Sequence, residues 1–133
     1  MDWSLGPYVL KPLLRKGSAF YTTWDPSGTQ DLSDFAQRQN YTEYSVREIK
    51  RLLAGCSQNL QTRWKPVAQG GILSTTIVGG LLLLLERLAE AGQLISKLDY
   101  PKLLTPIQVF DFSLYKSSGW AQLSKDLLAK IPL

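Results

Sequence analysis

Six basic side chains between positions 37 and 66 are the group in this sequence best suited to chemistry with another molecule. They are Arg38, Arg47, Lys50, Arg51, Arg63 and Lys65, against the two acids Glu43 and Glu48. The resulting formal balance of +4 equals the net charge of the whole chain. Guanidinium and ammonium groups presented by a helix can lie along a row of phosphates. We therefore predict that these six residues contact the backbone of a nucleic acid.

The chain has few of the side chains that usually carry out catalysis. There is no histidine and only one cysteine, Cys56, which excludes Cys/His zinc sites, haem ligation by histidine, and Ser-His-Asp or Cys-His nucleophiles. Ser113 and Lys116 have the Ser-x-x-Lys spacing of some acyl-transfer enzymes, but the companion motifs of those enzymes are missing. The glycine pairs lack the residues that complete a phosphate-binding loop. We predict a protein that is not an enzyme, needs no cofactor or metal, and is not built for a small molecule.

The acidic residues offer one further pattern. Glu86 and Glu90 lie one helical turn apart, which is a spacing used by metal-bridging carboxylates in helical bundles. No second pair and no histidine accompany them, so we expect a solvated polar face beside Arg87. Asp31 and Asp34 are expected to be helix caps.

Two helices should position the six basic residues. The first is a short helix that begins after a cap at Thr29 or Asp31 and ends near Asn40. The second begins at the capping box formed by Ser45 and Glu48 and continues to Pro66. Its predicted apolar stripe is Val46, Ile49, Leu52, Leu53, Cys56, Leu60 and Trp64, and its predicted outward side is Arg47, Lys50, Arg51, Gln58, Gln61 and Arg63.

The lone cysteine also bears on the compartment. A single cysteine cannot form an intrachain disulfide framework and suits a reducing environment. Its place on the apolar stripe predicts a buried, unreactive side chain. The N-terminal residues carry Asp2 and no apolar run before Pro12, so we expect no secretory signal and a cytoplasmic location.

The most apolar stretch of the chain runs from residue 67 to residue 98. Within it, residues 66–85 carry no charge, and a single helix of that length would just cross a bilayer core. The glycines and hydroxyl residues of this run weaken that interpretation. From Leu81 the apolar positions continue at spacings of three and four to Leu98, which favours the central helix of a bundle.

The glycines of this stretch allow two interpretations. Gly71, Thr75 and Gly79 lie four residues apart and would give a flat helix face that a neighbouring helix can approach closely. Alternatively, Gly70-Gly71 forms a turn after Pro66, and Gly79-Gly80 breaks the helix. The sequence does not decide between them.

The remaining segments complete the predicted fold. Residues 1–30 should form an irregular or short helical lead that docks through Trp3, Tyr8, Leu13 and similar residues, with an extended segment or ordered loop at 18–24. Thr105-Pro106 should begin a helix that buries Ile107, Phe110 and Leu114, and residues 120–131 should form the last helix. The size of the chain suits one domain, 1–133. We predict a mainly α fold, a small bundle of four to five helices in which residues 31–133 are the body.

The aromatic residues near the basic stretch also have two interpretations. Tyr41, Tyr44 and Trp64 lie among Arg38, Arg47 and Arg63, and such rings can stack on unpaired bases. Aromatic rings equally fill small cores and protein interfaces.

Two functional hypotheses follow. The first is a non-catalytic helical subunit that binds other protein subunits and contacts DNA or RNA. In size, helical character and basic balance the chain resembles the small subunits of CRISPR effector complexes, which implies a part in antiviral defence; the resemblance covers composition and length, and no residue role is carried over from it. The second is a membrane-associated accessory protein with a spanning or interfacial segment at 66–85, flanked by Lys50, Arg51, Arg63 and Lys65.

Overall fold

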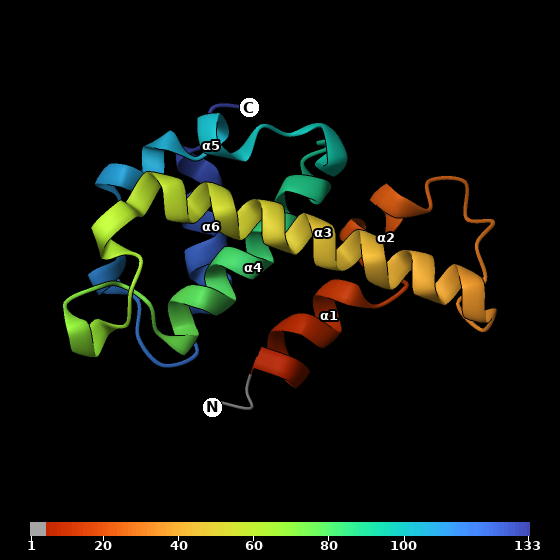
Figure 1. The fold of residues 1–133 in the computed structure, drawn as a ribbon, viewed down its shortest axis with the longest axis horizontal. Helices are drawn as coiled ribbons and strands as arrows, with labels where there is room; N and C mark the ends of the chain where they lie inside the picture. The colour runs from red at the N-terminus through yellow and green to blue at the C-terminus, as the bar shows by residue number, and fades with distance from the viewer. Residues whose placement is uncertain (1–4) are drawn as a thin grey trace.

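A computed structural model describes residues 5–133, and Figure 1 shows their path. The helices are α1 (Lys11–Leu14), α2 (Ala19–Trp24), α3 (Phe35–Leu60), α4 (Thr75–Glu90), α5 (Tyr100–Leu103) and α6 (Trp120–Lys130). Shorter π or 3-10 turns occupy Gly6–Leu10, Gln61–Arg63, Val67–Gln69, Ile95–Lys97, Thr105–Val109 and Phe112–Leu114. Within residues 5–133 no strand forms, and one isolated bridge joins Pro66 and Leu73. The predicted mainly α bundle with an irregular N-terminal lead is confirmed.

The longest element, α3, is one continuous helix of 26 residues. The predicted division near Asn40 and the predicted capping box at Ser45 are both wrong. Asp34 caps the helix instead, because its side chain accepts a hydrogen bond from the backbone N–H of Gln37 at 3.1 Å. Ser45 and Glu48 lie inside the helix and are buried. The helix ends at Leu60, before Gln61 with φ of 51°, and so stops short of Pro66.

The leucine-rich helix α4 has 16 residues and begins at the cap residue Ser74, whose hydroxyl accepts from the N–H of Ile77 at 3.3 Å. Gly70 makes the turn before it, with φ of 85°. Gly79 and Gly80 do not break α4. A Cβ on Gly80 would overlap the side chain of Leu123, so the glycine allows α6 to pack closely. The helix ends at Glu90, and the predicted continuation to Leu98 is wrong.

The predicted spanning segment at 66–85 is not a single helix. It contains the 3-10 turn Val67–Gln69, the turn at Gly70 and the first part of α4. In residues 5–133, no helix combines the length and the apolar character that a membrane crossing requires.

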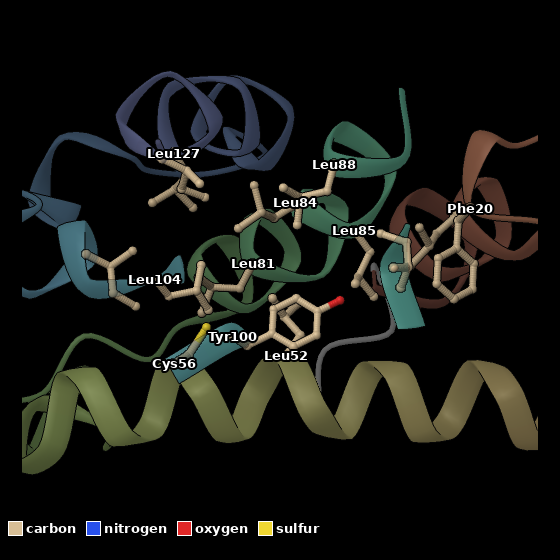
Figure 2. Packing of buried hydrophobic residues seen from close by; sticks show 14 of the residues in the cluster. Phe20, Leu52, Cys56, Leu81, Leu84, Leu85, Leu88, Tyr100, Leu104 and Leu127 are labelled. Atoms are coloured by element: carbon tan, nitrogen blue, oxygen red, sulfur yellow. The ribbon is translucent and has the colours of Figure 1, made fainter. Parts of the chain in front are cut away.

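The core lies on both sides of α4. Figure 2 shows the buried leucines of α4, including Leu81, Leu84 and Leu88, between α3 and α6. Cys56 of α3 and Tyr100 of α5 close one side of this layer. The predicted burial of Cys56 is confirmed, and burial raises the pKa of its thiol to about 12.

The lead folds against α4 and the N-terminal half of α3 (Figure 1). Residues 19–24 form the helix α2, not the predicted strand or loop, and Ser18 caps it by accepting from the N–H of Tyr21 at 3.0 Å. The carboxylate of Glu86 also accepts from the N–H groups of Ala19 and Phe20, at 2.9 and 2.8 Å. Trp3, one of the residues expected to dock, lies outside the described residues.

In the C-terminal third, one predicted helix forms as expected and another does not. α6 forms where the apolar stripe predicted it, and Leu123 and Leu127 are buried. The helix predicted from Thr105 is instead two 3-10 turns. Ile107 is buried as expected, but the Leu114 side chain is 75% exposed, so its predicted burial is wrong.

Candidate nucleic-acid interface

Arg47 and Lys50 form the outward cationic pair of α3. The Arg47 side chain is 59% exposed and Lys50 is exposed. Residues three apart are neighbours on a helix surface, so the two charges lie together. The guanidinium carbon of Arg47 lies 5.6 Å from the ring centroid of Tyr44, and its Nε lies 3.5 Å from the buried carboxylate of Glu48. Exposed Glu43, one turn before Arg47, partly offsets the positive charge here.

Arg51 is bound inward and does not belong to this outward pair. Its guanidinium donates to the carboxylate of Glu48 and to the carbonyl oxygens of Ile95 and Leu98. Its central carbon lies 5.1 Å from the ring centroid of Tyr100. Glu48 is only 1% exposed, so Arg51 supplies the charge that a buried carboxylate needs. The prediction that Arg51 faces outward is wrong.

Arg63 is also bound inward. Its Nη2 donates to the carbonyl oxygen of Gln108 at 2.7 Å and to that of Ile107 at 3.3 Å. The residue is half-buried, and it fixes the end of α3 to the turn Thr105–Val109. The predicted outward orientation of Arg63 is therefore wrong. Lys65 is half-buried in the loop that follows, where its carbonyl accepts from the N–H of Leu73.

Arg38 is exposed but lies on another side of α3. Nine residues separate it from Arg47, and at roughly 100° per residue this is half a turn of rotation. Its Nη1 lies 3.5 Å from the carbonyl oxygen of Leu32, and its guanidinium carbon lies 5.8 Å from the ring centroid of Phe35. The six predicted residues therefore do not share one face, and the structure brings only Arg47 and Lys50 together.

A second cationic region, which the sequence prediction did not include in the site, lies at the lead. Lys11, Arg15 and Lys16 are exposed. The hydroxyl of Tyr41 donates to the carbonyl of Leu14 at 2.8 Å and so holds these residues beside the N-terminal half of α3. Their close spacing in the sequence was the available signal. Hydrogen bonds from Ser33 lower the pKa of the exposed Asp31 carboxyl, and the nearby charge of Lys16 lowers it further by a smaller amount.

The aromatic residues expected beside the cations are mostly used in packing. Tyr41 and Tyr44 are buried and join the rings of the lead: Tyr21 and Trp24 lie 5.1 and 5.0 Å from Tyr41, and Phe20 lies 5.6 Å from Tyr44, between centroids. Neither ring is accessible for stacking on a base. Trp64 is half-buried against the core.

The carboxylate pair of α4 has structural partners. Glu86 accepts from the first N–H groups of α2, so it is not the solvated residue that the sequence suggested. Glu90 is exposed and forms an ion pair with Arg87 at 3.0 Å. In the part of the chain that the structure describes, no group of three or more potential metal ligands comes together.

Geometry thus reduces the candidate interface to the outward pair Arg47 and Lys50, with the cations of the lead as a second region. No family model, no curated protein and no solved structure matches this chain.

Proposed function

We propose that this chain is a non-catalytic helical subunit of a larger assembly, located in the cytoplasm, that contacts the backbone of a nucleic acid. The supporting observation is the outward pair Arg47 and Lys50 on the longest helix. Glu48, the acid nearest to them in sequence, is buried and already held by Arg51. Arg47 also lies 3.5 Å from the Glu48 carboxylate, so exposed Glu43 and this contact offset part of the positive charge, and Lys50 carries the rest. Two neighbouring cations on one helix face suit successive phosphates.

The surface also offers apolar contacts for protein partners. Large hydrophobic side chains are exposed at several sites, among them Tyr8, Phe35, Leu94, Val109 and Leu114. Val109 is 89% exposed, and it lies five residues from Leu114. Val109 and Leu114 line one surface hollow, and a contiguous apolar patch there is the kind of surface that a partner subunit covers. Purification of the tagged chain from its native host, followed by identification of co-purifying proteins and nucleic acid, tests this part.

The nucleic-acid part is tested by fluorescence anisotropy of labelled single-stranded DNA and RNA with the full-length protein. The affinity should fall as salt rises, because phosphate contacts release counterions. Replacing Arg47 and Lys50 with Glu should weaken binding at low salt by about tenfold or more. It should also reduce the slope of log K against log[salt] by about 1.4, the value for two contacts on a single strand.

The matched control reverses two exposed lysines elsewhere, Lys97 and Lys125, which changes the net charge by the same amount. That control should lose much less affinity than the Arg47 and Lys50 variant. A third variant, Lys11→Glu with Lys16→Glu, measures the share of the lead. Binding that ignores salt, or that weakens equally in the first variant and the control, contradicts a phosphate site at Arg47 and Lys50.

Arg51 is left unchanged in every variant. Its loss would leave the buried Glu48 carboxylate without its main partner. A loss of binding in such a variant could then come from unfolding of the protein. Circular dichroism of each variant should show the helical signal of the wild type.

A further inference from the structure

A pocket between the 67–77 segment and the 112–117 segment is separate from every cation of the proposed interface. Its volume is about 490 Å³, which lies within the usual range of small-molecule sites. Ile77 and Phe112 are buried in its wall, Val67 lies exposed at its rim, and Ile72 and Tyr115 add further apolar surface.

The lining of this pocket carries a single charge, which is positive. Lys116 is exposed and is the one charged residue among those that line this pocket, all of which lie in the described part of the chain. The remaining polar lining comes from the serines at 74, 113 and 117 and from Thr76. Apolar walls with one cation at the opening favour a ligand that has an apolar body and one anionic group.

The first wall is held in place without a ligand. Three backbone hydrogen bonds of 3.0–3.1 Å fix it: Ile72 to Arg63, Val67 to Leu73, and Leu73 to Lys65. Arg63 in turn donates to the carbonyl oxygen of Gln108. Gly71 is required here, because a Cβ at this position would overlap the Lys65 carbonyl.

The second wall is equally constrained. The hydroxyl of Thr76 donates to the carbonyl of Ser117 and joins this wall to α4. The hydroxyl of Tyr115 donates to Asp126 on α6, and the N–H of Ser113 donates to Asp111 at 2.9 Å. A ligand would thus enter a cavity that is already formed and would order little of the chain.

We propose that this pocket binds a small amphipathic anion, such as a medium-chain carboxylate or an aromatic sulfonate, with the apolar part between Ile77 and Phe112 and the anionic group at Lys116. The proposal is independent of nucleic-acid binding, and it departs from the prediction that the chain takes no small molecule. Either can fail without the other.

The test uses two fluorescent probes with the same aromatic system, anilinonaphthalene sulfonate and neutral phenylnaphthylamine. Both should bind the full-length protein with one site per chain, and decanoate should displace them. Val67→Trp places a large ring at the rim and should weaken both probes by about tenfold or more. Val46→Trp, at an exposed position of α3 outside the lining of this pocket, is the control and should leave both affinities unchanged.

The charge of the ligand is tested separately with Lys116→Gln. This variant should weaken the sulfonate by about three- to fivefold, as expected for one partly exposed ion pair, and should leave the neutral probe unchanged. Lys125→Gln is the matched control. Equal loss for both probes, or no loss for either, overturns the anionic assignment.

Nuclear magnetic resonance of the wild type makes the result independent of variant stability. Decanoate should shift the amide signals of Gly71, Ile77 and Ser117 in a saturable manner and leave those of Arg47 and Lys50 unchanged. Shifts spread over the whole chain, or probe binding that survives Val67→Trp at full strength, overturn the proposal.

Discussion

The two halves of α3 use the same residue types for different purposes. In the first part of α3, which runs to Lys50 just beyond its midpoint, the cations Arg38, Arg47 and Lys50 are exposed. In the C-terminal half, Arg51 binds carbonyls that lie 44 and 47 residues further along the chain. Figure 1 shows α5 beside the C-terminal part of α3, and the segment just before α5 supplies the Ile95 and Leu98 carbonyls that Arg51 binds. A guanidinium turns inward where tertiary structure brings unpaired carbonyls or a buried carboxylate within its reach.

The largest expected effect is the loss of Arg51. Arg51→Ala should lower the free energy of unfolding by about 2–4 kcal/mol in urea denaturation, because Glu48 is left buried without its main partner. Arg47 remains 3.5 Å from the Glu48 carboxylate, so the loss should fall below that of a fully isolated buried charge. A double variant with Glu48→Gln should recover part of the stability. An effect as small as that of Arg47→Ala would remove the distinction between the halves.

Next is the reactivity of Cys56, also in the second half. Its pKa is raised to about 12 by burial, so at pH 8 its thiolate fraction should be lower by roughly a thousandfold than that of an ordinary thiol. The native protein should react with a thiol reagent at least that much more slowly than the unfolded chain. The control is Cys56→Ala with Gln58→Cys, which places a thiol on the exposed side and should react quickly. Fast reaction of native Cys56 would show that this half opens readily.

A smaller effect is expected at Gly55, where α3 touches α5. A Cβ on Gly55 would lie 2.6 Å from the Cβ of Tyr100 and 2.9 Å from its carbonyl carbon. Gly55→Ala should therefore cost about 1–3 kcal/mol in thermal or urea unfolding, even though alanine favours a helix. Ala54→Ser, one residue earlier on the exposed side, should cost less than about 1 kcal/mol. A stabilising Gly55→Ala would mean that α5 does not pack this closely.

The smallest effect belongs to the outward pair. Replacing Lys50 with Ala should change the free energy of unfolding by no more than about 0.5 kcal/mol, since exposed charges contribute little to stability. Replacing Arg47 as well should add a small loss, because Arg47 lies 3.5 Å from the buried Glu48 carboxylate, and the sum should stay well below the loss in Arg51→Ala. Urea denaturation at two salt concentrations measures it. A large loss would show that this half of α3 is also tied to the body.

The sequence predicted the parts of the fold that local pattern determines. The apolar stripe of residues 120–131 gave α6. The position of Cys56 at helical spacing from Leu52 and Leu60 gave its burial. The turn at Gly70 was one of two stated alternatives. These features depend on residues close together in the chain, so periodicity and turn chemistry were sufficient.

The misplaced features depend on distant residues. Ser45 and Glu48 have capping-box spacing, but both are buried inside the continuous helix, and Glu48 pairs with Arg51, which in turn binds the distant carbonyls of Ile95 and Leu98. Arg51 and Arg63 looked exposed because the carbonyls that they bind belong to segments more than 40 residues away. Gly79 and Gly80 looked like a break because Leu123, which fills the space above Gly80, is equally distant. For the candidate site, the composition of residues 37–66 was enough to predict a basic helix. Which of its cations face solvent depends on the tertiary structure.

The two hydrogen bonds from Ala19 and Phe20 to the Glu86 carboxylate have a consequence for assembly. A partner that pulled the N-terminal lead away from α4 would remove two N–H donors from the Glu86 carboxylate and would leave the N–H groups of Ala19 and Phe20 without that acceptor. Recruitment should therefore leave that segment seated, with the incoming subunit meeting whatever it already presents to solvent.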